Sequence, residues 1–194
     1  MNEAIRRGVP CPLAGIGLFL AAMTLVGDLG AQPAQAMSVQ ASALYGGGPQ
    51  GAGSGPGWEV QLRLQPTSFS IGAGAEHTFH EITTANGREV QLLGGFLEPR
   101  WALVVARGAE LYLSARLTLS QVKLKEGAFR SSGTGYTLGG GGGLRLRLWG
   151  RLSLDAGALA GYSDVGVVEA PGGPLDLSTT TRLVGRVGLA VGVG

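Results

Sequence analysis

The sequence contains a single cysteine, Cys11, which lies in the first 36 of its 194 residues. Beyond that point the chain can form neither a disulfide framework nor a thiolate metal site. It also lacks an excess of charge, because residues 37–194 carry 13 Arg and Lys against 11 Asp and Glu, with the basic residues dispersed. This balance argues against a nucleic-acid partner. No segment after residue 36 keeps a helical period, which disfavours a helical fold.

The first 36 residues have the pattern of a secretory signal. Two arginines near the start precede an apolar run over residues 13–26, and Ala34-Gln35-Ala36 matches a small-residue cleavage site. A membrane anchor is the alternative, but the run is interrupted by two glycines and is shorter than the roughly 20 residues that a spanning helix needs. We therefore expect a cleaved signal over residues 1–36 and one domain over residues 37–194.

Polar and apolar residues alternate through most of residues 37–194. A period of two predicts β-strands with one apolar and one polar face. The 31 glycines of this region follow no collagen repeat and lie within the alternating segments, which disfavours low-complexity disorder. Eight strands are expected, over residues 39–47, 58–65, 67–80, 88–106, 109–121, 134–148, 151–163 and 179–193. The first of these alternates least clearly, and without it the count is seven.

The connections between these strands are expected to alternate in length. Very short ones at Pro66, Arg107-Gly108 and Trp149-Gly150 separate longer ones over residues 48–57, 81–87, 122–133 and 164–178. Short turns on one side, long loops on the other and an even strand count are typical of outer-membrane barrels. The predicted fold class is therefore all-β, a closed antiparallel up-and-down transmembrane β-barrel of eight strands.

One strand departs from simple alternation. Over residues 88–106 the apolar phase changes between Leu92 and Trp101, if every apolar residue is assigned to the lipid face. This predicts a β-bulge near Gly94-Gly95, because glycine tolerates the backbone conformation of a bulge.

The polar faces of the strands carry charges of both signs. In a soluble sandwich these residues would form a solvated surface, whereas in a closed eight-stranded barrel they point into an interior just wide enough for side chains to fill. We predict that arginine forks pair there with carboxylates, and that Gly139, Gly141 and Gly143 make room for the long side chains. The predicted interior network comprises Glu59, Arg63, Glu98, Arg100, Glu110, Arg116, Arg145, Arg147, Asp155, Arg182 and Arg186. Its surplus arginines need water, hydroxyls or backbone carbonyls as partners.

Aromatic residues gather near the ends of the expected strands. If the long loops lie outside the cell, one group falls at the outer membrane interface and the other at the periplasmic interface, as in the aromatic girdles of such barrels. Soluble sheets also place aromatic residues near strand ends. The predicted outer group is Tyr45, Trp58, Phe79, Tyr136 and Tyr162, and the predicted periplasmic group is Phe69, Trp101 and Trp149.

The chain resembles the small eight-stranded outer-membrane barrel families, such as the OmpA transmembrane domain, OmpX and OmpW-like proteins. The resemblance rests on the signal, the loop alternation and the hairpins WALVVARGAELYLSARL (101–117) and GLRLRLWGRLSLDAGALAGY (143–162). It implies an outer-membrane location, contact with outer-membrane lipids and lipopolysaccharide, and insertion by the barrel-assembly machinery after delivery by periplasmic chaperones. Such barrels usually finish on an aromatic residue, whereas this chain ends Ala-Val-Gly-Val-Gly. Either that signal is degenerate here or the sequence stops early.

Candidate catalytic and metal-binding residues are few. His77 and His80 lie in the segment EHTFHE, but on a strand they point to opposite sides, which spoils a shared metal site. Ser68 and Ser70 lie on the face opposite to His77, which weakens an acyl-transfer arrangement. We expect no catalytic residue, cofactor or metal. The leading prediction is a non-enzymatic outer-membrane barrel with a structural or limited small-solute permeability role. A lipid-modifying enzyme on the same barrel and a soluble periplasmic β-barrel or sandwich remain as alternatives.

Overall fold

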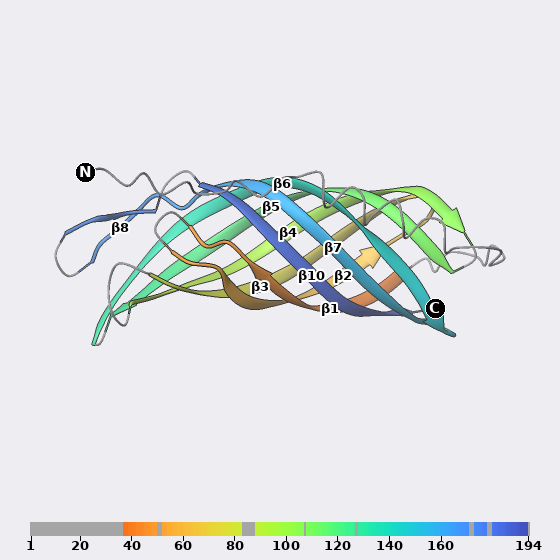
Figure 1. Cartoon of the computed structure of the whole chain (residues 1–194), viewed down its shortest axis with the longest axis horizontal. Helices are drawn as coiled ribbons and strands as arrows, with labels where there is room; N and C mark the ends of the chain where they lie inside the picture. Colours follow the sequence, from red (N-terminus) through yellow and green to blue (C-terminus); the bar gives the residue numbers. More distant parts are fainter. Residues whose placement is uncertain are drawn as a thin grey trace, which may run out of the picture.

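The alternating segments form long antiparallel strands that close into a barrel (Figure 1). The computed structural model describes residues 37–49, 52–82, 88–106, 108–126, 128–170, 173–177 and 180–193, so the predicted signal over residues 1–36 lies outside it. The barrel strands are β1 (Met37–Gly46), β2 (Gly55–Leu64), β3 (Phe69–Glu81), β4 (Arg88–Ala106), β5 (Ala109–Glu126), β6 (Phe129–Trp149), β7 (Leu152–Asp164) and β10 (Thr180–Val193). A separate two-stranded sheet contains β8 (Val167–Val168) and β9 (Leu175–Asp176). In this part of the chain no helix is long and apolar enough to cross a membrane.

The barrel is closed by the first and last strands. The order around it is β1-β10-β7-β6-β5-β4-β3-β2, and β1 pairs with β10 from Met37 opposite Val193 to Gly46 opposite Val184. The segment that alternates least clearly in the sequence is therefore a full strand with neighbours on both sides. The predicted closed antiparallel barrel of eight strands is confirmed.

The faces of the sheet are inverted relative to those of a soluble protein. On β5, Leu113, Leu117 and Leu119 point outward and are 52%, 43% and 65% exposed. The polar residues between them, Ser114, Arg116 and Thr118, point inward, and Arg116 is only 7% exposed. A soluble barrel or sandwich would bury its apolar face, so neither alternative fits this arrangement.

The two ends of the barrel differ in their connections. At the end that we call the turn end, β4–β5 and β6–β7 are joined by tight turns that contain Gly108 and Gly150, with positive φ angles of 82° and 52°. Only glycine adopts this backbone conformation without a steric cost. The opposite end, which we call the loop end, carries β8 and β9 and lies at the left of Figure 1.

The predicted long loop over residues 122–133 is wrong. Pairing between β5 and β6 continues to Glu126 opposite Phe129, so that only residues 127–128 join the two strands. The strands run on because Val122 and Leu124 are fully buried on the inward face, where they gain the hydrophobic contacts that a loop would lack.

The predicted bulge near Gly94-Gly95 is also wrong. β4 pairs with β5 in one register from Arg88 to Ala102, and the irregularity falls between Ala102 and Val104. Leu92 points inward together with Val90 and Phe96, so no change of phase is needed. The prediction failed because it assigned every apolar residue of the strand to the lipid-facing side.

An apolar cluster fills the barrel at the loop end, and we call it the loop-end plug. Residues at the end of β3, on β4 and β5, and in the segment around β8 and β9 form it, and each is at most 5% exposed. Its members are Ile82, Val90, Leu92, Val122, Leu124, Val165, Val168 and Leu177. The segment around β8 and β9 thereby packs against inward residues of β4 and β5 at this end.

Candidate functional site: the charged barrel interior

Below the loop-end plug, the interior is occupied by charged side chains from six strands. Four arginines and four carboxylates interact there, and all eight are less than 9% exposed. The arginines are Arg63 on β2, Arg100 on β4, Arg116 on β5 and Arg186 on β10, and the acids are Glu59 on β2, Glu76 on β3, Glu98 on β4 and Asp155 on β7. We call this group the charged core.

Glu98 is the carboxylate that most of these arginines share. Its Oε1 lies 3.2 Å from Arg63 Nη2 and also accepts a hydrogen bond from Arg100 Nε. Its Oε2 lies 2.7 Å from Arg186 Nη1 and 3.4 Å from Arg116 Nη1. A fully buried carboxylate keeps its charge at low cost only when it is paired and hydrogen-bonded, and Glu98 has four cationic partners.

Asp155 and Tyr112 form a second centre beside Glu98. Asp155 Oδ2 accepts a hydrogen bond of 2.6 Å from Arg100 Nη1, and its Oδ1 accepts one of 2.9 Å from the Tyr112 hydroxyl. That hydroxyl in turn accepts a hydrogen bond of 2.9 Å from Arg186 Nη2. The Arg100 guanidinium also lies 4.3 Å from the centre of the Tyr112 ring, a cation–π distance.

Arg116 connects the charged core toward the loop end. Its Nη1 donates a hydrogen bond of 2.7 Å to Glu59 Oε2, and its Nη2 lies 2.8 Å from Glu76 Oε2. The guanidinium also stacks 3.5 Å from the centre of the Phe96 ring. Charge pairing and ring stacking thus hold one side chain across the width of the barrel.

Inward glycines leave space for these long side chains. A Cβ atom on Gly143 would lie 2.3 Å from the Tyr112 hydroxyl, and one on Gly72 would lie 2.7 Å from Arg63 Nη2. Gly139, Gly141 and Gly143 all lie on the inward face of β6, but only Gly143 meets a side chain of the network. A larger residue at Gly143 or Gly72 would displace the ion pairs.

Some predicted network residues lie apart from the charged core. At the turn end, Arg145 Nη1 donates a hydrogen bond of 3.0 Å to Gln65, whose amide donates one of 2.9 Å to Glu110. Arg147 is partly exposed on the same strand. At the other end Arg182 Nε donates a hydrogen bond of 2.8 Å to the Gly47 carbonyl, which is the kind of backbone partner expected for a surplus arginine.

Three members of the interior were missing from the predicted network. Glu76 is on the polar face of its strand in the sequence pattern, but the predicted network did not include it. Tyr112 and Phe96 are in phase with the inward residues of their strands, but the predicted network comprised charged residues alone. Their inward position was available from the alternation alone.

Comparisons with known proteins bear on the fold. No protein-family model matches the sequence, and no curated protein sequence matches it. Among solved structures, Neisserial surface protein A is 20% identical, with a TM-score of 0.63 over 84% of this chain and 100% of that chain. A major outer membrane protein from Thermus thermophilus is 16% identical, with a TM-score of 0.55 over 82% of this chain and 99% of that one. Ail, the attachment invasion locus protein of Yersinia pestis, is 13% identical, with a TM-score of 0.50 over 80% and 95%.

The fold is that of the eight-stranded outer-membrane β-barrels. The predicted resemblance is therefore confirmed, and at these identities it is a likeness of fold.

The structure places the aromatic residues predicted for the membrane interfaces in two groups on the outer surface. Tyr45, Trp58, Phe79, Tyr136 and Tyr162 lie toward the loop end, and Phe69, Trp101 and Trp149 lie toward the turn end. The Phe69 and Trp101 rings are 5.2 Å apart on neighbouring strands. Their contact with the membrane interfaces stays a prediction.

The two histidines of EHTFHE point to opposite faces of β3. His77 packs on the outside between the rings of Trp58 and Phe79, at 5.9 and 4.2 Å. His80 is 2% exposed inside the barrel, within hydrogen-bond distance of Thr78 and the Gly53 carbonyl. Within the described ranges, no three or more His, Cys, Asp or Glu residues are grouped so that they could hold a metal ion.

Proposed function

We propose that this chain is an integral outer-membrane β-barrel protein, non-enzymatic and with a structural role. The inverted faces support this proposal most strongly, because exposed apolar side chains on all eight barrel strands require hydrocarbon around them. The loop end would then face the exterior and the turn end the periplasm. Insertion of such a barrel is expected to depend on periplasmic chaperones and the barrel-assembly machinery.

Cell fractionation tests the location. The protein should sediment with the outer membrane, require detergent for extraction and migrate differently on gels before and after boiling, because a closed barrel resists detergent unfolding. A soluble periplasmic protein of the same size provides the control. Release from broken cells without detergent would contradict the proposal.

We also propose that permeation through the barrel is limited to small solutes at low conductance. The charged core crosses the interior, and the loop-end plug packs apolar side chains inside the barrel at the loop end. In planar bilayers we expect conductance well below that of a general porin. Replacing Arg145 and Arg147 by alanine should shift ion selectivity toward cations, because it removes two positive charges near the turn end. Arg151→Gln, on an exposed turn, is the control, and unchanged selectivity in the double variant would contradict a path past these arginines.

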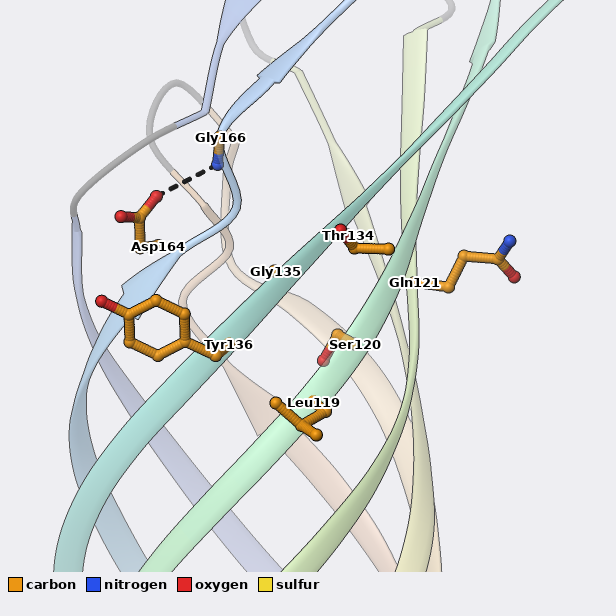
Figure 2. A pocket seen from close by; sticks show the side chains of 8 residues that line it. All are labelled: Leu119, Ser120, Gln121, Thr134, Gly135, Tyr136, Asp164 and Gly166. Carbon is orange, nitrogen blue, oxygen red and sulfur yellow. Dashed lines mark hydrogen bonds between the residues drawn. The ribbon is translucent and has the colours of Figure 1, made fainter.

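The outward face of the β5–β6 hairpin suggests a lipid partner. We call this face the hairpin ladder. Toward the loop end its side chains change from apolar to uncharged polar and then to basic. The successive cross-strand pairs are Leu117–Leu138, Leu119–Tyr136, Gln121–Thr134, Lys123–Ser132 and Lys125–Arg130. Figure 2 shows the middle layers, where a groove of about 580 Å³ lies beside Leu119, Tyr136, Gln121 and Thr134.

This layering matches a phosphorylated glycolipid such as lipopolysaccharide. Acyl chains would contact the leucines and Tyr136, and phosphates would meet Lys123, Lys125 and Arg130. Ail, which has the same fold, has been solved in complex with the heparin analogue sucrose octasulfate, a polyanionic sugar. We propose that the hairpin ladder binds lipopolysaccharide through its phosphates.

Lipopolysaccharide retention tests the hairpin ladder. Detergent-purified protein with Lys123, Lys125 and Arg130 all changed to glutamine should retain several-fold less lipopolysaccharide than the native chain, whereas Arg151→Gln should retain the native amount. Dephosphorylated lipopolysaccharide should bind the native protein as weakly as it binds the triple variant. Equal retention by all proteins would contradict the assignment.

The enzymatic alternative finds little support in the histidine positions. His77 and His80 are separated by the wall of the barrel, and the partners of His80 are the Thr78 hydroxyl and the Gly53 carbonyl rather than a serine that it could activate. Ser70 faces inward like His80, but it accepts a hydrogen bond from Arg63. Expression of the native chain, His77→Ala or His80→Ala should leave the lipid A composition of the host unchanged, as measured by mass spectrometry.

A further inference from the structure

The barrel interior holds more positive than negative charge. Among the described residues, five arginines and four acids are less than 9% exposed, which leaves an excess of one positive charge. The arginines are Arg63, Arg100, Arg116, Arg182 and Arg186, and the acids are Glu59, Glu76, Glu98 and Asp155. The positions after Met37 that the structure leaves undescribed contain no Asp or Glu that could balance it. His80 has partners suited to a neutral ring, the Gly53 carbonyl and the Thr78 hydroxyl.

The excess charge is located at Arg182. Its side chain is 4% exposed, it forms no ion pair with a described residue, and its Nε donates to the Gly47 carbonyl. The other eight buried charges all belong to ion pairs of the charged core. Glu76 attracts Arg182 electrostatically, but it is already paired with Arg116 at 2.8 Å. Because a buried excess charge is strongly disfavoured, the site favours an anion from another source.

A small cavity lies beside Arg182. Its volume is about 40 Å³, and its lining combines Arg116, Glu76 and Thr118 with apolar residues such as Leu159 and Val184. Arg116 Nε and Nη2 are buried and have no hydrogen-bond acceptor among the described residues, although Nη2 lies 2.8 Å from Glu76 Oε2. Two guanidinium groups and one carboxylate therefore border the same small space, with a net charge of +1.

We propose that this cavity binds one monatomic anion of the size of chloride between Arg116 and Arg182. Because a water molecule needs about 10–15 Å³ of such space, the cavity suits a monatomic ion with a water molecule better than a larger organic anion. The unused donors of Arg116 and the excess charge of Arg182 attract the ion, and the apolar wall limits competition from bulk water. The site would complete the neutralisation of the barrel interior.

Bromide provides the direct test, because it replaces chloride and scatters anomalously. Crystals of the detergent-folded protein grown in bromide should show an anomalous peak in the cavity between Arg116 and Arg182. The unfolding midpoint should rise with chloride or bromide and reach a plateau, compared with gluconate at equal ionic strength, which the cavity excludes.

Two variants locate the effect. Arg182→Gln should lose both the bromide peak and the halide dependence of the unfolding midpoint. Arg151→Gln removes one positive charge from an exposed turn and should keep both. The absence of a bromide peak in native crystals, equal midpoints in chloride and gluconate, or a halide dependence that persists in Arg182→Gln would each overturn the proposal. The native measurements decide the matter even if Arg182→Gln fails to fold.

Discussion

Two regions of strand β5 have the same alternation but place opposite kinds of side chain on the outer surface. Up to Ser120, leucines point outward and polar side chains such as Arg116 point inward. From Gln121 onward, polar residues including Lys123 and Lys125 point outward, while Val122 and Leu124 are fully buried inside. Pairing with β6 runs through both regions without a register shift. The phase of the strand is therefore constant, and the solvent outside it changes.

The switch between Ser120 and Gln121 coincides with the group of aromatic residues at the loop end. Leu119 pairs with Tyr136, and Gln121 pairs with Thr134 immediately beyond. On the turn-end side of this point the strand exposes apolar residues and buries polar ones, as in a membrane protein. On the loop-end side it exposes polar residues and buries apolar ones, as in a soluble protein. The two interiors are consequently held together differently, by ion pairs in the charged core and by hydrophobic burial in the loop-end plug.

The largest expected effect is in the charged core. Glu98→Gln removes the carboxylate shared by Arg63, Arg100, Arg116 and Arg186, so that buried guanidinium groups lose their main counter-charge. Loss of one partner of a buried ion pair costs about 3–5 kcal/mol. Urea unfolding in detergent micelles, followed by tryptophan fluorescence, should show a decrease of this size or a failure to fold. A decrease under about 1 kcal/mol would contradict the role of Glu98.

The next effect concerns the outer surface of the same strand. Leu117→Arg places a charge on the lipid-facing side between the two aromatic groups, where it should cost about 2–4 kcal/mol in a bilayer. Gln121→Arg makes a comparable change four residues along, beyond the aromatic group, and should cost about 0–1 kcal/mol. Folding equilibria in lipid vesicles measure both. Equal free-energy costs for the two variants would contradict a membrane boundary at the switch between Ser120 and Gln121.

Sequence alternation predicted which residues share a face along most strands, and the inward arginines and acids followed from it. It failed at Leu92, Val122 and Leu124, because a period of two groups residues by face without stating which solvent each face meets. The export pattern and the leucines suggested lipid along the whole of β4, so Leu92 was assigned to the outward face, and Val122 and Leu124 were assigned to a loop. Tyr112 was left out for a different reason, because the predicted network comprised charged residues alone.

Which arginine pairs with which carboxylate in the charged core could not be predicted from the sequence. Arg186 and Glu98 are 88 residues apart, and Arg116 and Glu59 are 57 apart. Their contact depends on the tilt of the strands and on the stagger between β2, β4, β5 and β10, which bring different sequence positions to one height in the barrel. Alternation does not specify how far along the barrel axis a residue lies. It therefore predicted which residues belong to the network and left their pairing open.

The loop-end plug should respond less than the charged core. Leu124→Ala removes a fully buried side chain, a change that costs about 2–5 kcal/mol in a well-packed core. We expect a value near the lower limit, because the short β8–β9 sheet can settle into the space. Protease cleavage between residues 165 and 179 should become faster. The barrel itself should still resist unfolding in detergent when the sample is not boiled. An effect on the whole barrel equal to that of Glu98→Gln would mean that the two interiors unfold as one.

The smallest effect is expected at the turn end of the same interior. Arg145 is partly exposed, and the hydrogen bond described for its guanidinium runs to Gln65 rather than to a fully buried carboxylate. Solvent can therefore replace its partners, and Arg145→Gln should reduce the free energy of unfolding by about 1 kcal/mol or less. Urea unfolding alongside Glu98→Gln gives the comparison directly. If Arg145→Gln is as damaging as Glu98→Gln, the charged core extends to the turn end, and burial does not separate the two groups of charges.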